Sequence, residues 1–265
     1  MTKNTLFVLG ARDPEMVEIE KVLKACGQQF AHASIGQNRC TPANAYMGNS
    51  VALFTLDKAP QPIMLHPHCD VIFIECKIHH RKAVKRIDHH NPGDAGFDKS
   101  PAQYLDGSSL GQVLSHFGIA PTPTQMLLAA GDHCLTAAYQ GHCPGIDPGE
   151  LLFLRTSWQA KMSGRTLGEV IAGVLRAAEE VRRSYNPTVG ASIFLDPTAV
   201  PHDLPEGAAY TGIPIIYRAL SPHGILKEMI KGGSEEQILN FMCEHKSHGR
   251  RVYGNPFRGY AGAYL

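Results

Sequence analysis

The sequence predicts an α/β fold in two parts: a parallel-sheet N-terminal domain and a smaller C-terminal α/β domain. The chain opens with an apolar run followed by a helical pattern, and further short apolar runs come next. Helical periodicity dominates the middle of the chain, and strand patterns return near the C-terminus. Strands that alternate with helices are typical of α/β folds, and 265 residues are enough for two modest cores.

The N-terminal domain is expected to begin with a buried strand and a helix. Residues 5–10 form an apolar run, and residues 14–27 follow with Pro14 in the first helical turn and Gly27 closing the helix. Further apolar runs predict strands at 51–56, 71–75 and 83–88, separated by loops rich in Pro, Gly, Asn and His. A mixed or parallel sheet is the natural assembly of these strands.

After Ser108 the pattern changes from short apolar runs to helical spacing. Leu110, Val113, Leu114 and Phe117 form an apolar stripe that Gly118 ends. The remaining elements are predicted as helices at 124–139, 148–161 and 167–185, strands at 191–195 and 213–217, and helices at 222–231 and 234–245. We therefore expect a first domain over residues 1–165, a connector helix over 166–185 and a second domain over 186–265.

The overall charge argues against two classes of partner. Charged residues make up 18% of the chain and the formal net charge is +1, so neither long nucleic acid nor a membrane surface is expected as the main partner. The seven cysteines contain no CxxC pair and fit neither a disulfide framework nor a zinc ribbon. The first apolar stretch is too short for a signal peptide or a membrane span, so we expect a cytoplasmic protein.

One segment joins the end of a predicted strand to an acid and two imidazoles. Asp88, His89 and His90 offer one hard oxygen ligand and two nitrogen ligands, a mixture that suits Mn, Zn, Fe or Co. Because adjacent side chains of an extended chain point to opposite faces, we assign Asp88 and His89 to a metal and expect His90 to face a substrate. A polar loop whose histidines are merely solvated is the alternative.

Further carboxylates lie close to the ends of other elements. They are Asp13, Glu15, Glu75 and Asp132. Two divalent ions about 3.5 to 4 Å apart need about this many carboxylates to balance charge and complete coordination. The structural alternatives are a helix N-cap for Asp13, a favourable first-turn charge for Glu15 and an ordinary turn acid for Asp132.

Taken together, these motifs resemble those of the DHH phosphoesterase family, whose members hydrolyse phosphate esters and anhydrides with two manganese ions. The strand ending in Ile87-Asp88-His89-His90-Asn91 resembles the third motif of the family. Asp13-Pro14-Glu15 is similar to the first motif, and Glu75 and Asp132 lie where the second and fourth motifs carry aspartates. Ser108–Leu114 resembles the small-residue helix after the DHH motif, and the resemblance covers about residues 5–140.

The chain departs from the family pattern in its first two motifs and in its C-terminal domain. The family places a histidine ligand several residues before the paired acids, whereas no histidine precedes His32 in this chain. Glutamate replaces aspartate at Glu15 and Glu75, which lengthens each side chain by one methylene. Residues 249–260 only loosely resemble the glycine-rich substrate loop of the family's second domain.

The resemblance implies a metal-dependent phosphohydrolase in which a metal-bound hydroxide attacks phosphorus. The ligands of two Mn²⁺ would be Asp13, Glu15, Glu75, Asp88, His89 and Asp132. Asp88 would bridge the ions, while His90 would stabilise the phosphoryl group or donate a proton to the leaving oxygen. The first domain would then be the catalytic domain and the second the substrate-binding domain.

The C-terminal domain carries side chains that suit a phosphorylated substrate. Arg250, Arg251 and Arg258 can pair with phosphate oxygens, and Tyr253 can stack on a base. We expect a small substrate such as a nucleotide, cyclic dinucleotide or short oligonucleotide. A surface tail with anchoring aromatics is the alternative for this segment.

Two other functions are compatible with the same residues. A non-catalytic nucleotide-binding or scaffold module could derive from the same fold. A mononuclear metal hydrolase acting on amide or carbonyl substrates would use the same ligands but leaves the C-terminal arginines without a role. A homodimer is compatible with the sequence.

Overall fold

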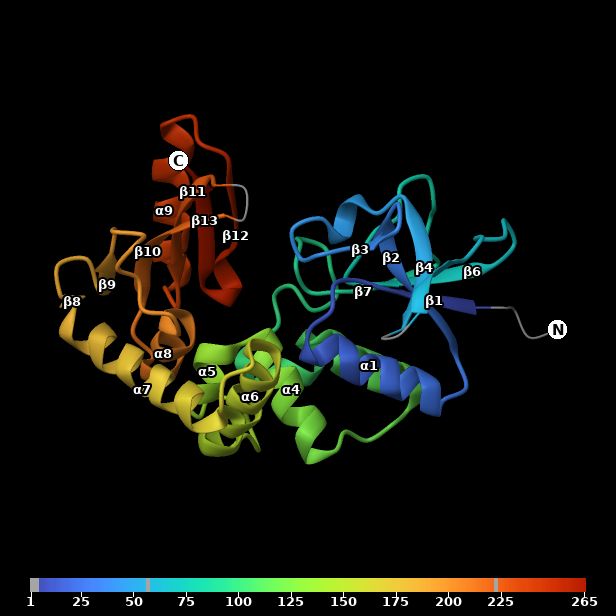
Figure 1. The fold of residues 1–265 in the computed structure, drawn as a ribbon, viewed down its shortest axis with the longest axis horizontal. Helices are drawn as coiled ribbons and strands as arrows, with labels where there is room; N and C mark the ends of the chain where they lie inside the picture. Colours follow the sequence, from blue (N-terminus) through green and yellow to red (C-terminus); the bar gives the residue numbers. More distant parts are fainter. Residues whose placement is uncertain (1–4, 56–57, 222–223) are drawn as a thin grey trace. The chain divides into compact units, whose positions relative to one another are not determined.

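The computed structural model describes residues 5–55, 58–221 and 224–265, and the chain divides into two compact units (Figure 1). Unit 1 comprises residues 1–99 and 103–132, and unit 2 comprises residues 100–102 and 133–265. Each unit contains a mixed sheet, so the predicted α/β class is confirmed. The division falls earlier than residue 165, and the helices that were assigned to the end of the first domain and to a connector belong to unit 2. Unit 2 is therefore not the smaller of the two.

Unit 1 is built on a sheet whose centre is parallel and whose one side is antiparallel. The strands lie in the order β5-β4-β2-β1-β6-β7, and β3 pairs with β2. The parallel strands are β1 (Thr5–Leu9), β2 (Gln29–Ile35), β6 (Asp70–Ile74) and β7 (Lys85–Ile87). The antiparallel strands are β3 (Asn38–Arg39), β4 (Ser50–Thr55) and β5 (Lys58–Pro62).

The strands β1, β4, β6 and β7 confirm the predicted strands, and Leu56, the predicted end of β4, lies outside the described residues. The strand β2 was not predicted, because His32 and Ser34 interrupt its apolar pattern although both are fully buried. The edge strand β5 was also not predicted, because Pro60 at its centre and Pro62 at its end argue against a strand except at the edge of a sheet.

The helices of unit 1 cover one face of its sheet. They are α1 (Pro14–Ala25), α2 (Tyr104–Gly107), α3 (Ser109–Phe117) and α4 (Pro123–His133). The 3-10 turn η1 (Ala45–Met47) also belongs to unit 1, and the 3-10 turn η2 (Pro101–Gln103) lies across the division between the two units. Phe7 and Leu9 of β1 pack in one buried cluster with Met16 of α1 and Leu110 of α3. Leu6 and other alternate residues face a second cluster on the opposite side. This packing holds the first turns of α1 and α3 near the ends of β1, β6 and β7.

Unit 2 contains a second mixed sheet, in the order β12-β13-β11-β10-β9-β8 (Figure 1). Its strands are β8 (Tyr185–Asn186), β9 (Ala191–Phe194), β10 (Ile215–Leu220), β11 (Leu226–Lys231), β12 (Val252–Asn255) and β13 (Tyr260–Tyr264). Its helices are α5 (Leu135–Tyr139), α6 (Pro148–Ser163), α7 (Leu167–Arg183), α8 (Leu204–Thr211) and α9 (Glu235–Ser247), with the 3-10 turn η3 (Pro256–Arg258). The helices predicted over 148–161, 167–185 and 234–245 are confirmed with small changes at their ends.

Three predictions for this part of the chain are wrong. The predicted helix over 222–231 is the strand β11, which pairs with β10 on one side and β13 on the other; Pro222 lies outside the described residues. Pairing on both sides overrides local helix propensity. The predicted helix over 124–139 is interrupted at Cys134, and the C-terminal segment expected to be a loop contains β12, η3 and β13. Helix α8 was not predicted at all.

No helix in the described part of the chain combines the length and the apolar character needed to cross a membrane.

Candidate metal centre

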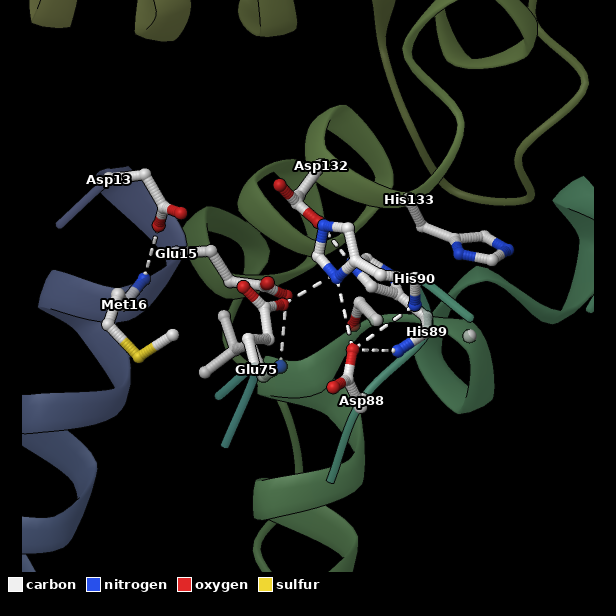
Figure 2. Close-up of polar contacts among 12 residues, drawn as sticks. Asp13, Glu15, Met16, Glu75, Asp88, His89, His90, Asp132 and His133 are labelled. Carbon is white, nitrogen blue, oxygen red and sulfur yellow. Dashed lines mark hydrogen bonds and ion pairs between the residues drawn. The ribbon is translucent and has the colours of Figure 1, made fainter. Parts of the chain in front are cut away.

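Four side chains that are distant in the sequence meet in unit 1. Their ligand atoms all lie within 4.8 Å of one another, and Figure 2 shows the side chains pointing towards a common point. We call this group the four-residue cluster, and its members are Glu15, Glu75, His89 and Asp132. The Nε2 atom of His89 lies 3.3 Å from Glu75 Oε1 and 3.0 Å from Asp132 Oδ2. A second group of three combines Glu75 and His89 with His90.

The position of Glu75 depends on a close approach of two strand ends. Glu75 directly follows β6 and has a left-handed backbone with φ 51°, which is unusual for a residue other than glycine. Gly10 follows β1, and its backbone N–H donates to the Ile74 carbonyl at 2.9 Å. A Cβ at position 10 would collide with the carbonyl oxygen of Glu75. The glycine therefore permits the strained turn that directs the Glu75 carboxylate into the centre.

Glu15 is fully buried between the first turns of two helices. It lies in the first turn of α1, and its Oε1 atom accepts a hydrogen bond of 2.9 Å from the backbone N–H of Leu110 in α3. Its Oε2 atom is buried and has no hydrogen-bond partner among the described residues. Burial first, and then the charges of Asp132, Glu75 and Asp13, raise the pKa of Glu15 well above its usual range. In this setting the protonated form of Glu15 is favoured unless a cation lies beside it.

Asp13 lies beside the four-residue cluster but belongs to neither group. Its Oδ1 atom accepts a hydrogen bond of 2.7 Å from the backbone N–H of Met16, which makes Asp13 the N-cap of α1. Figure 2 shows its side chain apart from the clustered carboxylates. Burial, then Glu75 and Asp132, raise the pKa of Asp13 to about 8. The structure thus shows Asp13 as the N-cap of α1. The negative charges of the cluster still raise its pKa.

Asp88 is also outside both groups, although the resemblance to the DHH phosphoesterases implies that it bridges two ions. Its carboxylate accepts hydrogen bonds from the hydroxyl of Tyr46 at 3.0 Å and from a guanidinium nitrogen of Arg86 at 3.1 Å. It also accepts from the backbone N–H groups of His89 at 2.8 Å and His90 at 3.1 Å. Burial by itself raises the pKa of Asp88, but the hydrogen bonds and charge of His90 lower it to about 2. These donors surround the carboxylate, which stays ionised and belongs to neither group.

The contact between Asp88 and His90 sets the protonation of the imidazole. His90 Nδ1 lies 3.0 Å from Asp88 Oδ1, and an ionised carboxylate can only accept, so we assign the proton to Nδ1. Nε2 is then the ring nitrogen that can bind a metal ion or a substrate. The arrangement is the one that commonly orients a metal-binding or acid–base histidine.

The donor set fits a divalent metal ion. Three carboxylates and one imidazole converge, two of the carboxylates are buried, and Glu15 Oε2 has no hydrogen bond among the residues that the structure describes. A divalent cation would offset this concentration of negative charge. Oxygen ligands with one nitrogen suit Mn, Fe, Zn or Co more than a soft ion.

The residues predicted to bind substrate lie in unit 2 and do not share one set of contacts. Arg250 lies 2.9 Å from His245 Nδ1, and Arg258 Nε donates to the His133 carbonyl at 3.2 Å. Arg251 and Tyr253 meet at another ring: the guanidinium of Arg251 is 5.5 Å from the centroid of Tyr264, and the rings of Tyr253 and Tyr264 are 5.9 Å apart. Lys227 adds its ammonium group 4.6 Å from the centroid of Tyr264.

Sequence reasoning missed the residues that support the histidine motif. Tyr46 comes from η1, and Arg86 also pairs with Asp94 at 3.0 Å. Arg86 precedes Asp88 by two positions, a spacing that lets both side chains lie on one face of an extended chain and could have indicated the pair. Nothing in the sequence around Tyr46 indicates its contact with Asp88.

No family model matches the chain, and no curated protein matches it either. The geometry and chemistry of the cluster are therefore the basis for assigning a function.

Proposed function

We propose that this protein is a metal-dependent phosphohydrolase whose centre is the four-residue cluster. The observation that carries the proposal is the convergence of three carboxylates and one imidazole in unit 1, with a buried Glu15 oxygen that has no hydrogen bond among the described residues. A divalent ion in this centre supplies Lewis acidity and lowers the pKa of water, so that hydroxide is available near neutral pH to attack phosphorus. Mn²⁺ is the ion we expect, as the resemblance to the DHH phosphoesterases implies.

The number of ions follows from the side chains that each group provides. The four-residue cluster offers four side-chain donors to one ion. The second group, with His90, shares Glu75 and His89 with the cluster, so a second Mn²⁺ has fewer side chains of its own. We therefore infer one tight ion and a second, weaker one.

When only the tight ion is bound, His90 is available to act on the substrate, and Asp88 positions it. The His90 side chain keeps 32% of its surface exposed, so a phosphoryl oxygen can reach the ring. The ionised Asp88 accepts the hydrogen bond from Nδ1 and so orients the ring of His90, which can stabilise phosphoryl charge or donate a proton to the leaving oxygen. Tyr46 and Arg86 in turn hold the Asp88 carboxylate by hydrogen bonds. Burial and the charge of Asp88 raise the pKa of Tyr46, so its hydroxyl keeps the proton that it donates.

For the substrate we propose a small phosphorylated compound such as a nucleotide, cyclic dinucleotide or short oligonucleotide. The support comes from unit 2, where Arg251 and Lys227 both lie within cation–π distance of the Tyr264 ring and Tyr253 packs beside that ring. Cations can pair with phosphate oxygens, and tyrosine rings can stack on bases.

The test is hydrolysis of these compounds with Mn²⁺, Mg²⁺ or Co²⁺, together with the metal content of the protein. Asp132→Asn should abolish Mn-dependent turnover and lower Mn²⁺ affinity at least tenfold. The matched control is Asp98→Asn, which neutralises an exposed acid of unit 1 and should behave as the wild type. Mn²⁺ binding without turnover of any compound would support the non-catalytic module instead, and equal turnover by Asp132→Asn would refute the assignment.

A further inference from the structure

Two thiols of unit 2 lie within contact distance of each other. Cys134 precedes α5 and Cys143 follows it, and their Sγ atoms are 3.2 Å apart. Cys143 is buried, whereas Cys134 is partly exposed. Neither residue has a role in the proposed hydrolysis, so the pair is a separate chemical feature.

We propose that Cys134 and Cys143 are a modification site, at which a low-molecular-weight disulfide converts the two thiols into a reversible intramolecular disulfide. A disulfide needs its sulfur atoms about 2.05 Å apart, so the two Sγ atoms must approach by only about 1 Å. The segment that the bond would close contains the short helix α5 and a turn in which Gly141 and Gly145 have positive φ. A change of this size is within the reach of side-chain rotations and a small adjustment of this turn.

The difference in exposure determines the order of the two steps. The thiolate of Cys134 attacks one sulfur of the small disulfide, the S–S bond of that compound breaks, and one small thiolate leaves. The thiolate of Cys143 then attacks the Cys134 sulfur and displaces the second small thiolate. The two cysteines lose two electrons and two protons in total, and the small disulfide gains them as two thiols.

The environment of Cys143 favours the second step. The hydrogen bond from Cys134 lowers the pKa of Cys143 more than burial raises it, which increases the share of the nucleophilic thiolate. Cys40 and Cys76 of unit 1 differ, because burial raises the pKa of both thiols. Cys243 lies exposed on α9 and serves as an accessible reference thiol.

The bond would hold both ends of α5. Tyr139, at the end of this helix, donates a hydrogen bond of 2.5 Å to Glu206, which also pairs with Arg155 at 2.6 Å. The bond would therefore restrain the end of α5 from which Tyr139 contacts this ion pair. Cys134 also follows Asp132 by two positions, so the bond would restrain the backbone directly after a candidate metal ligand.

The experiment uses the full chain, oxidised glutathione and peptide mapping. Trypsin cleavage after Lys99 and Arg155 leaves a peptide in which Cys134 and Cys143 are the only cysteines, and Tyr139 between them allows a second cleavage by chymotrypsin. In the wild type, this peptide should lose two hydrogens, and its halves should stay joined after cleavage at Tyr139 until dithiothreitol is added. Cys243→Ser is the matched control and should give the same bond.

Two single variants separate the steps. Cys143→Ser should keep a stable glutathione adduct on Cys134, because the second nucleophile is missing. Cys134→Ser should leave Cys143 without an adduct while Cys243 reacts, because Cys143 is buried. Two results with the wild type would overturn the proposal. Either both thiols remain open to alkylation under conditions that modify Cys243, or glutathione stays attached to Cys134 of the wild type. The wild-type result alone decides this even if a variant fails to fold.

Discussion

The sharpest prediction concerns Asp13, whose carboxyl group lies beside the clustered acids. Asp13→Asn should stabilise the metal-free protein at neutral pH and have little effect in acid. An asparagine at this position can still accept the hydrogen bond from Met16 and remains a good N-cap, so α1 keeps its start. What the substitution removes is a carboxylate that burial and its neighbours Glu75 and Asp132 force to take up a proton.

The magnitude follows from proton linkage. The pKa of Asp13 is raised from 3.8 to about 8 in the folded protein. Between these values the folded state binds a proton that the unfolded state lacks, so the free energy of unfolding falls as pH rises, by about 1.4 kcal/mol per pH unit. Wild-type Asp13 therefore lowers stability by at most about 4 kcal/mol near pH 7 and by about 2 kcal/mol near pH 5. The asparagine does not titrate, so the variant should gain these amounts.

The assay is urea unfolding of EDTA-treated protein, followed by circular dichroism, across about pH 5 to pH 7. The exposed Asp98→Asn variant is the control and should follow the wild-type curve. A stability difference between Asp13→Asn and wild type that is the same at both ends of the range would refute the reasoning, as would a wild type that gains stability on going to pH 7. Addition of Mn²⁺ to the variant shows separately whether Asp13 is also a ligand, because loss of a ligand weakens binding.

Other predictions test the remaining parts of the centre. Gly10→Ala should destabilise by about 3 kcal/mol in urea unfolding, because the new methyl meets the Glu75 carbonyl; Gly168→Ala, on a helix with open space around it, should change stability by less than about 1 kcal/mol. Asp88→Asn should keep the Mn²⁺ stoichiometry while turnover falls about 10- to 100-fold. The pKa of Asp88 is lowered from 3.8 to about 2, so its ionised form stabilises the folded protein above its ordinary pKa. In acid unfolding the wild type should lose this stabilisation between about pH 4 and pH 2, and Asp88→Asn should show no such loss. Mn²⁺ at 100 times its Kd should add about 2.7 kcal/mol to wild-type stability and much less to Asp132→Asn.

The sequence was informative where local pattern and chemistry agree. The strand β1, the helix α1 with its Asp13 cap and the helix α3 between Ser108 and Gly118 all form as predicted. The residues at the ends of these helices supply hydrogen bonds to the unpaired backbone groups there, and the sequence alone is enough to locate such residues. The strand β11 and the C-terminal hairpin of β12 and β13 were missed, because partners elsewhere in the chain decide whether such segments pair.

The same division applies to the candidate centre. Glu75 and His89 could be predicted because each follows a strand of a parallel sheet, and such strand ends meet at one edge. Asp88 could not be placed, since its direction depends on Tyr46 and Arg86, which take its carboxylate away from the cluster.

Composition and local pattern are enough to establish the α/β class, the ends of several elements and the types of ligand that the chain offers. Which of these ligands meet depends on long-range packing. Glu15 and Asp132 are far apart along the chain, and they approach because α1 and α4 belong to one compact unit with the parallel strands. The physical reason is that helix caps and apolar periodicity act between near neighbours, whereas the direction of a buried carboxylate depends on backbone turns and on hydrogen-bond donors from distant segments. The left-handed turn of Glu75, permitted by Gly10 on another strand, is the clearest instance.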